Sequence, residues 1–331
     1  MSKSNQNINI VKGASFDLTN SKISEYRMKW ENNPKQFIVE PYPLHLDIEI
    51  TNHCNLKCSF CASTIYDYEK KGFMSFELFQ KIIDESSEMN LYALKLNWRG
   101  EPLLHKQVIE MVKYAKSKNI PDVFINTNGY FLDSTIAENL IDAGIDRIIL
   151  SFEGCTSEVY EKYRVGSDFN RVYENIKLLS SLKKQKKSNT PYIRVQSVCV
   201  PEMQDNIENY KKLWSEIADE ISIIDYRDEL SQHSDNSLFY DEWQCPYLWL
   251  RLTISYDGLV YPCCFVTKNS ESYGESGVLG NVNTSLISSI WNDDTLREYR
   301  LLHKKGESQK ISICKVCSYR DTELQKNIKG C

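Results

Sequence analysis

The chain has 331 residues, long enough for one large domain or two of ordinary size. Hydrophobic residues account for 41% of it and charged residues for 26%, which is typical of a globular protein with a packed core. The net charge of −5 argues against a nucleic-acid-binding surface, and no apolar run approaches the roughly 20 residues of a membrane-spanning helix.

Eleven cysteines are the most unusual part of the composition. The N-terminal residues, MSKSNQNINIVKG, have neither the hydrophobic core nor the cleavage site of a secretory signal. Thiols in a chain without such a signal favour metal or redox chemistry in a reducing compartment over disulfide bonds. We therefore expect a cytoplasmic protein that acts on a small molecule, with no nucleic-acid or membrane partner.

Strand and helix patterns alternate from Leu44 onward, after a polar, irregular stretch over residues 1–43 in which one helix is expected near 21–30. Short apolar runs predict strands over residues 44–50, 92–97, 122–126, 146–151, 192–199 and 220–225. Amphipathic runs between them predict helices over residues 75–88, 106–117, 133–143, 168–183 and 205–218. Ser75 is expected to cap the first of these helices, and Gly144 to end the third. The alternation predicts βα units on a parallel sheet over residues 44–227.

The pattern changes after residue 227, and residues 228–331 are expected to form a separate C-terminal domain. The segment DELSQHSDNSLFYDEWQ is polar and turn-rich, and it predicts a linker. Beyond it, LRLTIS and LVYP flank a Tyr-Asp-Gly turn and predict a β-hairpin, because Asp-Gly between apolar runs is a strong hairpin signal. A helical pattern follows near residues 286–303, so the domain is expected to combine a hairpin with a helix.

Three cysteines directly follow the first predicted strand with the spacing C-x3-C-x2-C, at Cys54, Cys58 and Cys61. Thiolate is the usual protein ligand of iron–sulfur clusters. Three thiolates hold three irons of a cubane [4Fe–4S] cluster and leave the fourth iron open, as a catalytic metal centre requires. The alternatives are a zinc site or core cysteines, but zinc usually recruits a fourth Cys or His at close spacing, and His53 adjoins Cys54 too closely.

The motif and its place after a strand resemble the signature of the radical S-adenosylmethionine (SAM) enzymes, and the resemblance covers roughly residues 44–225. It implies an α/β fold built on a partial (β/α)6 TIM-type barrel with a C-terminal iron–sulfur extension. It also implies that the open iron binds the amino and carboxylate groups of SAM, and that one electron splits SAM into methionine and a 5′-deoxyadenosyl radical. A flavodoxin- or ferredoxin-type electron donor is the expected partner.

The resemblance assigns SAM contacts to residues at the ends of successive predicted strands, where the chemistry of parallel-stranded barrels collects. NWRGEP resembles the family's glycine–glycine–glutamate motif, with Gly100 and Glu101 in place and Arg99 where the first glycine usually lies. Arg164 resembles an arginine that pairs a carboxylate of SAM or of substrate. The remaining SAM contacts that the resemblance implies are Phe60 at the adenine, Asn126 and Asn128 of the NTNG motif, Ser151 and Gln196. Taken singly, Asn128 also fits a simple turn and Arg164 a surface ion pair.

A second cysteine set lies in the C-terminal region, at Cys245, Cys263, Cys314 and Cys317. It resembles the SPASM/twitch extensions of radical SAM enzymes, which bind auxiliary [4Fe–4S] clusters. The further C-x5-C-x3-C run of a full SPASM pattern does not follow Cys317, so the resemblance implies one auxiliary cluster, as in the shorter twitch arrangement. Four thiolates leave no open iron, which suits electron transfer better than substrate binding. A zinc ribbon stays open as an alternative.

The pattern predicts no specific ligand role for the four further cysteines. Cys264 directly follows a proposed ligand and could replace Cys263 in that role. For Cys331 three alternatives stay open: a spare thiol, an exchange ligand or no role. Cys155 and Cys199 fall near predicted strand ends and are more simply read as buried core thiols.

The reaction that the resemblance implies is oxidation of a secondary alcohol of a sugar or cyclitol. In this hypothesis the radical abstracts a C–H hydrogen, a base removes the hydroxyl proton, and the auxiliary cluster accepts the remaining electron to leave a ketone. Candidates for the base and the substrate anchor are Glu153, Arg164, Asp225 and Arg227.

Three alternatives to this oxidation stay open. The first is epimerisation of a sugar or residue, with Cys155 or Cys264 as the thiol that returns hydrogen. The second is modification of a ribosomal peptide or protein. The third is an electron-transfer or scaffold protein that never cleaves SAM, against which Gly100, Glu101 and the NTNG motif count.

Overall fold

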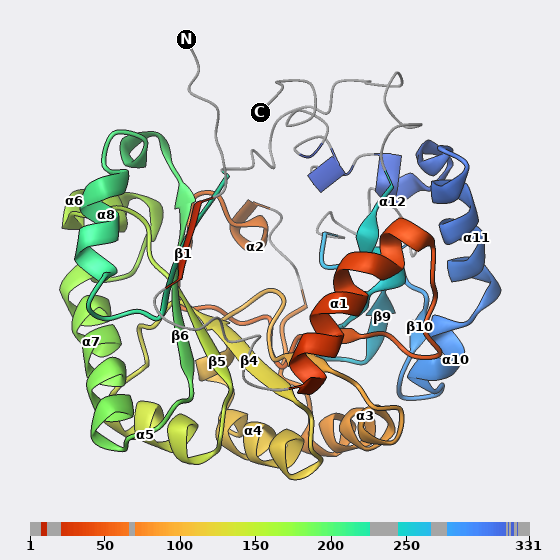
Figure 1. The fold of residues 1–331 in the computed structure, drawn as a ribbon, viewed down its shortest axis with the longest axis horizontal. Helices are drawn as coiled ribbons and strands as arrows, with labels where there is room; N and C mark the ends of the chain where they lie inside the picture. The colour runs from red at the N-terminus through yellow and green to blue at the C-terminus, as the bar shows by residue number, and fades with distance from the viewer. Residues whose placement is uncertain are drawn as a thin grey trace.

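The computed structural model describes residues 8–11, 21–65, 70–225, 244–265 and 277–315, together with Cys317, Tyr319, Arg320 and Glu323. Within these residues the strands form one open sheet in the order β1-β7-β6-β5-β4-β3-β2-β8-β9-β10. Strands β2 to β7 run parallel in chain order (Figure 1). The strands are β1 (Ile8–Val11), β2 (His45–Ile48), β3 (Ala93–Lys95), β4 (Asp122–Thr127), β5 (Arg147–Ser151), β6 (Tyr192–Cys199), β7 (Glu220–Asp225), β8 (Arg251–Ile254), β9 (Leu259–Tyr261) and β10 (Gly280–Asn281).

Helices follow the parallel strands and form an arc around the outer face of the sheet (Figure 1). The helices are α1 (Ser21–Gln36), α2 (Ala62–Ile65), α3 (Phe76–Glu88), α4 (Val108–Ser117), α5 (Ser134–Asp142), α6 (Ser157–Tyr163), α7 (Phe169–Gln185), α8 (Ile207–Trp214), α10 (Ile287–Trp291), α11 (Asp294–Lys304) and α12 (Ser312–Lys315), with 3-10 turns η2 (Pro102–Leu104), η3 (Pro201–Met203), η5 (Pro246–Trp249) and η6 (Ser308–Lys310). No described helix is long and apolar enough to cross a membrane.

The alternation of strands and helices confirms the predicted fold class, an α/β partial barrel whose sheet stays open. Ser75 caps α3 by accepting a hydrogen bond from the Leu78 amide at 3.1 Å, and Gly144 follows α5 with a φ of +78°. Both residues act as the sequence predicts, since a side-chain oxygen satisfies a free amide at the helix start and glycine tolerates the left-handed turn at its end. Helix α6 was not predicted, and α8 is shorter than the predicted 205–218.

Side chains along β2 alternate between two environments, as the period of two of a strand requires. Leu46 and Ile48 join the hydrophobic core with Phe79 of α3. Asp47 and Glu49 point to the opposite, inner face of the sheet and are fully buried there. The apolar core therefore lies between the sheet and the helices, whereas the inner face is polar.

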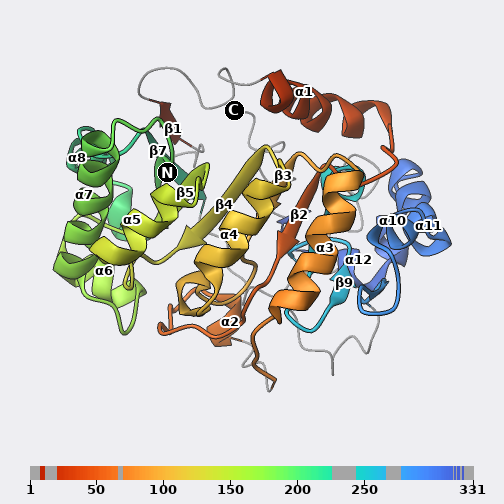
Figure 2. The same cartoon turned by 90° about the horizontal axis from the view of Figure 1, so that it is seen from below.

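The N-terminal stretch contains more structure than its polar composition indicates. Helix α1 extends to Gln36, beyond the predicted 21–30, and its Tyr26 packs with Leu44 and Leu250 at the amino-terminal ends of the strands. Figure 2 shows α1 and α2 at opposite ends of the parallel strands. Strand β1 was not predicted, and it pairs antiparallel with β7.

The C-terminal hairpin forms where the Asp-Gly turn predicts it, with Gly258 at a φ of +92°. Its first strand, β8, pairs parallel with β2, so the hairpin extends the barrel sheet. The single predicted helix over 286–303 is two helices, α10 and α11, because Asp293 caps a new helix start. The predicted linker lies almost wholly outside the described residues, and the domain boundaries after residues 43 and 227 stay predictions.

Candidate active site

The three cysteines of the first motif lie on the loop that joins β2 to α2, at the carboxyl ends of the parallel strands. Backbone hydrogen bonds hold this loop against the end of α6 and the residues that follow it. The Lys57 amide donates to the Val165 carbonyl at 2.9 Å, and the Ser59 amide donates to the Tyr163 carbonyl at 3.2 Å. The position of the thiols is therefore set by a second loop far away in the sequence.

These thiols sit in a partly desolvated environment beside a cation. Burial raises the pKa of Cys58 to about 12, and the nearby guanidinium of Arg164 opposes this rise. The Arg164 Nη1 atom lies 3.8 Å from the Cys58 sulfur. The charges of Cys54 and Cys61 also act on the pKa of Cys58, which indicates that the three thiols share a small volume.

This donor set suits an iron–sulfur cluster. The candidate ligands in this loop are thiols, and proteins usually hold iron–sulfur clusters through thiolates that bind several irons. Among the described residues, no three His, Cys, Asp or Glu side chains converge as they would around one metal ion.

Gly100 and Glu101 pack directly against the start of the cysteine loop. Gly100 has a φ of +74°, and a Cβ there would lie 2.4 Å from the Thr51 carbonyl oxygen. The Glu101 amide donates to the His53 carbonyl at 2.7 Å. Only glycine fits this approach of two backbones, which explains why the motif needs Gly100.

The Glu101 carboxylate joins the ends of β3 and β4. It accepts hydrogen bonds from the Thr127 hydroxyl at 2.6 Å and from the Asn128 amide at 2.8 Å. Burial raises the pKa of Glu101 above its ordinary value, although these hydrogen bonds oppose the rise. The Asn128 side chain in turn donates to the Asn55 side-chain oxygen at 2.9 Å, which ties β4 to the cysteine loop.

Three further predicted SAM contacts lie on the inner face at this end of the sheet, namely Asn126, Ser151 and Gln196. Ser151 and Gln196 are neighbours in register on β5 and β6. The Asn126 amide donates to the Asn97 side chain at 2.8 Å, whereas its own side-chain oxygen is buried without a hydrogen-bond partner among the described residues. An unsatisfied buried acceptor of this kind fits a position that a ligand donor completes.

Arg164 and Glu153 form a buried ion pair beside the cysteine loop. Two guanidinium nitrogens donate to the two carboxylate oxygens, with Nη2 at 2.9 Å from Oε1. The Phe60 ring centroid lies 5.7 Å from the Arg164 guanidinium carbon. The structure thus brings these three predicted residues together. Any direct contact of Arg164 or Phe60 with SAM, or of Glu153 with substrate, stays a prediction.

The remaining candidates of the barrel are more dispersed. Cys155 is half-buried between β5 and α6, and its thiol lies 3.7 Å from the Asn206 carbonyl oxygen. Cys199 is buried at the end of β6. The side chain of Asp225 and all of Arg227 lie outside the described residues, as does Cys331.

The second cysteine set assembles from separate segments around η5, β9 and α12. Burial raises the pKa of Cys263 strongly, and the charges of Cys245, Cys314 and Cys317 add to the rise. The four thiols are therefore close enough to influence one another. Cys264 acts on the pKa of Cys245 as well, so the choice between Cys263 and Cys264 as ligand stays open.

His303 is part of this second set, and the sequence analysis missed it. Its Nδ1 accepts a hydrogen bond from the Cys245 amide at 3.2 Å, and its Nε2 lies 3.4 Å from the Cys314 sulfur. Because Nδ1 accepts, Nε2 carries the proton and donates to the sulfur. Burial lowers the pKa of His303 to about 4, so the ring is neutral. A lone histidine on a helix carries no sequence signal for this role.

Trp98 and Arg99 connect the two cysteine sets, a link that the sequence also did not reveal. The Trp98 indole nitrogen donates to the Cys264 carbonyl at 2.7 Å. The Arg99 guanidinium stacks on the Trp98 ring at 4.0 Å and donates to both carboxylate oxygens of Glu49, at 2.6 and 2.8 Å. Arg99, which departs from the family's glycine, is thus fixed to the strand that leads into the first cysteine loop.

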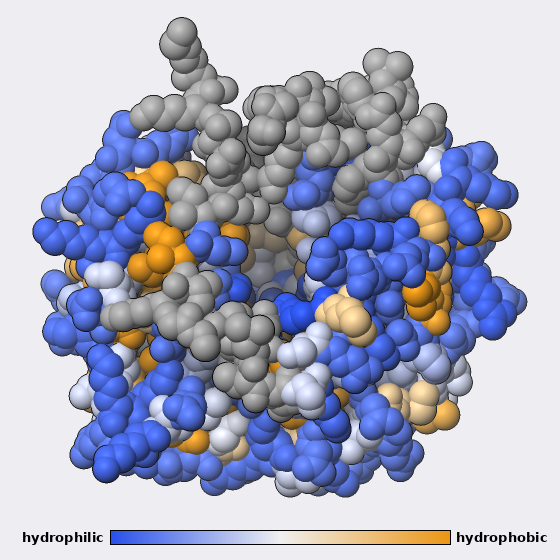
Figure 3. Space-filling model, viewed as in Figure 1, coloured by the Kyte–Doolittle hydropathy of each residue, from blue (hydrophilic) through white to orange (hydrophobic). Residues whose placement is uncertain are grey.

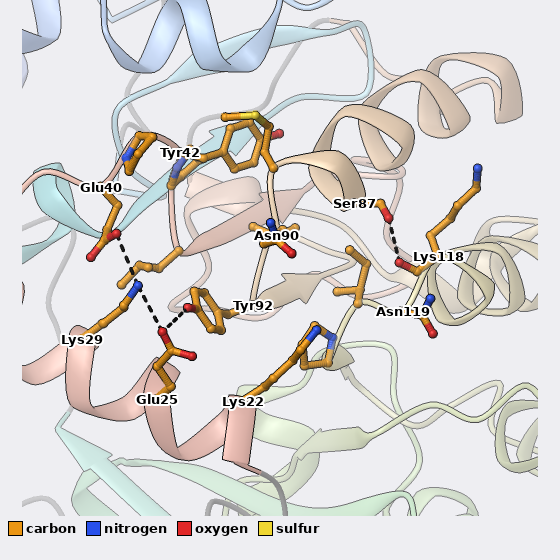
Figure 4. A pocket seen from close by; sticks show the side chains of 17 residues that line it. Lys22, Glu25, Lys29, Glu40, Tyr42, Ser87, Asn90, Tyr92, Lys118 and Asn119 are labelled. Atoms are coloured by element: carbon orange, nitrogen blue, oxygen red, sulfur yellow. Dashed lines mark hydrogen bonds and ion pairs between the residues drawn. The ribbon is translucent and has the colours of Figure 1, made fainter.

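A separate cavity of about 520 Å³ lies at the opposite, amino-terminal ends of the strands. Figure 4 shows Lys29 of α1 between Glu25 and Glu40 on its wall, with Tyr92 donating to Glu25. Its lining includes Leu44, Tyr92 and Pro121, which precede or adjoin the starts of β2, β3 and β4. The lining of this cavity includes no cysteine of either set, and the cavity is not part of the candidate active site.

Family models match the two stretches of the chain that contain the two cysteine sets. A family model for the radical SAM superfamily matches residues 48–205, and a model for an iron–sulfur cluster-binding domain, SPASM, matches residues 245–318. The chain is 36% identical over 132 residues to a probable GTP 3′,8-cyclase of Methanocaldococcus jannaschii. This match covers 40% of this chain and 44% of the relative. The chain thus spans less than half the length of this relative. It is 23% identical over 318 residues to a tungsten-containing aldehyde ferredoxin oxidoreductase cofactor-modifying protein of Pyrococcus furiosus, covering 84% of this chain and 88% of that one.

Solved structures share the fold at low sequence identity. BtrN in complex with AdoMet and 2-DOIA is 19% identical with a TM-score of 0.58, and the match covers 85% of this chain and 94% of BtrN. Streptococcus suis SuiB bound to its precursor peptide is 14% identical with a TM-score of 0.64, over 85% of this chain and 72% of SuiB. Residues 48–205 therefore form a radical SAM domain and residues 245–318 a SPASM-type domain, and the cofactors of these two domains are SAM with a SAM-binding [4Fe–4S] cluster and an auxiliary iron–sulfur cluster.

Proposed function

We propose that this enzyme oxidises a hydroxyl group of a small polar substrate, of the sugar or cyclitol class, to a ketone. The observation that carries the proposal is the pairing of two different thiol sets through Trp98 and Arg99. A three-thiol set leaves room for SAM at one iron, and a four-thiol set leaves none. An alcohol oxidation needs both functions, because a hydrogen atom and a further electron must leave the substrate.

The proposed cofactor ligands divide between the two ends of the chain. The three N-terminal thiols would hold the SAM-binding cluster, and SAM would lie along Gly100, Glu101 and the inner-face residues of β4 to β6. The C-terminal thiols would hold the auxiliary cluster. When bound, these groups supply a radical that removes a hydrogen atom and an acceptor for the remaining electron.

The protein's own residues would orient the substrate and take up the hydroxyl proton. Glu153 is the candidate proton acceptor, because it is a buried carboxylate next to the cysteine loop. Arg164 holds both of its oxygens and would fix the direction in which the carboxylate faces. The Val198 amide lies 3.5 Å from one of these oxygens and supports the same orientation.

A flavodoxin- or ferredoxin-type protein would supply the electron that starts the reaction, and the cytoplasm would be its compartment.

The test compares products from candidate substrates under anaerobic conditions. Reconstituted enzyme, SAM and dithionite are incubated with 2-DOIA, with GTP or with a panel of sugars, and 5′-deoxyadenosine and substrate masses are followed. Oxidation predicts a product lighter by two hydrogens and equal in amount to 5′-deoxyadenosine. The Cys54/Cys58/Cys61→Ala variant is the control and should form neither compound.

Other outcomes would replace the proposal. A product of the same mass as the substrate, with hydrogen exchanged from solvent, would indicate an epimerase. A cyclised product from GTP would indicate the activity named for the methanogen relative. Absence of SAM cleavage by intact, iron-loaded enzyme would contradict radical chemistry altogether.

A further inference from the structure

The inner face of the sheet carries a row of charged side chains near the base of the barrel. The strand register places Asp47 of β2 beside Lys95 of β3, and Lys95 beside Phe124 of β4. Side chains of residues paired in a parallel sheet point to the same face. Asp47 and Lys95 therefore share the inner face, away from the apolar core.

Every acidic side chain of this inner face has an arginine partner among the described residues. The pairs are Asp47 with Arg251, Glu49 with Arg99, Asp122 with Arg147 and Glu220 with Arg194. Lys95 is an additional cation in this arrangement. Its ammonium nitrogen lies 3.7 Å from an oxygen of Asp47, beyond hydrogen-bonding distance, and no described residue accepts a hydrogen bond from it.

A second donor at the same place also lacks a partner. Arg251 is 8% exposed, and its Nε atom has no hydrogen-bond acceptor among the described residues. An unsatisfied buried donor is costly, so such groups in native proteins normally meet water or a ligand. Both groups adjoin Asp47, since Arg251 donates to one of its oxygens and Lys95 lies near the other.

Asp47 Oδ1 is also buried without a hydrogen-bond partner among the described residues, 3.7 Å from the Lys95 ammonium nitrogen. His45 Nε2 lies 3.4 Å from Asp47, and its Nδ1 faces the Tyr26 hydroxyl at 3.1 Å. Burial lowers the pKa of His45 to about 4, so this side chain adds no positive charge. The charges of Asp47, Arg251 and Lys95 therefore sum to one positive charge.

This part of the sheet is reachable. The side chain of Lys95 keeps 18% of its surface exposed. Figure 3 shows hydrophilic residues over most of the described part of the face on which α1 lies. A ligand could thus contact the ammonium group without unfolding of the sheet.

We propose that Lys95 and Arg251 bind an anionic group of the substrate, a carboxylate or a phosphate, on the inner face of the barrel. An anion offers several acceptor oxygens and one negative charge or more, which matches the surplus at this place. The identification of the bound molecule as substrate rests on the proposed function, whereas the anion site itself does not.

The test is calorimetric titration of the reconstituted holoenzyme with inorganic phosphate and, separately, with acetate. The variant is Lys95→Met, which keeps the length and apolar stem of the side chain. The matched control is Lys113→Met, because Lys113 is exposed on α4 on the outer side of the sheet. Circular dichroism and thermal melting establish that all three proteins are folded.

We expect saturable binding of at least one anion to the wild-type enzyme and to Lys113→Met. In Lys95→Met this affinity should fall about tenfold or more, and Lys95→Arg should recover part of it. Binding of phosphate alone assigns a phosphate group to the ligand, and binding of acetate alone assigns a carboxylate.

Equal affinity in wild type and Lys95→Met, or no saturable binding of either anion to the wild type, would overturn the proposal. Neither titration involves turnover. A failed oxidation assay would therefore refute the proposed function without changing the outcome of this test.

Discussion

The two cysteine sets differ in how the chain builds them. The first set lies within one short loop, from Cys54 to Cys61, and backbone hydrogen bonds fix that loop on the edge of the sheet. The second set gathers thiols from Cys245 to Cys317, on segments that flank β8 and β9, and β8 pairs with β2. A local set can be recognised by spacing, whereas a dispersed set depends on the whole fold and on neighbours such as His303.

The largest expected difference between the sets concerns SAM cleavage. Cys58→Ser should abolish 5′-deoxyadenosine formation, because the SAM-binding cluster loses a ligand. Cys245→Ser should leave SAM cleavage largely intact and remove substrate oxidation. Chromatographic assay of 5′-deoxyadenosine in both variants checks this. Equal loss of SAM cleavage in the two variants would show that the sets do not act separately.

A glycine substitution tests how tightly the first loop is held. Gly100→Ala should cost about 3 kcal/mol or more of unfolding free energy, because its φ of +74° strains alanine and the Cβ would meet the Thr51 carbonyl at 2.4 Å. Gly144→Ala is the matched control, with a similar φ of +78° but no atom closer than 3.9 Å. It should cost only about 1 kcal/mol.

Denaturant unfolding of the two alanine variants measures this difference. Similar losses at both positions would mean that the backbone at Gly100 moves freely away from Thr51. In that case the close packing of the glutamate motif on the cysteine loop would not be required for stability.

His303 distinguishes the second set from the first. His303→Phe should shift the reduction potential of the auxiliary cluster to more negative values, on the order of tens of millivolts, because a hydrogen bond to a ligand sulfur is lost. The potential of the SAM-binding cluster should not move. Redox titration followed by EPR checks both values, and a shift of both clusters would contradict the local role of His303.

The smallest expected effect concerns the link between the sets. Trp98→Phe keeps an aromatic ring against Tyr261 and Arg99 but loses the hydrogen bond to the Cys264 carbonyl. We expect about 1 kcal/mol less stability and a changed EPR line shape of the auxiliary cluster, with SAM cleavage unaffected. An unchanged auxiliary signal would mean that Trp98 does not position the Cys263–Cys264 segment.

Much of the fold could be predicted because its signals are local. The six parallel strands, the cap at Ser75 and the turn at Gly258 each follow from the residues within a few positions. Strand β1 could not be predicted in this way. It has four residues, and its pairing with β7 supplies the hydrogen bonds that its own sequence does not specify.

The candidate site likewise combines features that the sequence shows with contacts that only the fold creates. The spacing of the first cysteines and the Gly100-Glu101 pair are visible in the sequence. The partners of these residues are not, because Glu101 bonds to Thr127 and Arg164 to Glu153 only after separate strands meet. Trp98 and His303 have unremarkable sequence surroundings, and their contacts with the second set arise from tertiary packing alone.

The most direct test of two clusters with separate ligand sets is iron and sulfide analysis with EPR on anaerobically reconstituted protein, wild type beside Cys54/Cys58/Cys61→Ala. This account predicts about eight irons per chain in the wild type and about four in the variant, with loss of the signal that responds to SAM. About four irons in the wild type falling to none, with zinc retained, would contradict it, because the C-terminal thiols would then hold a structural zinc ion.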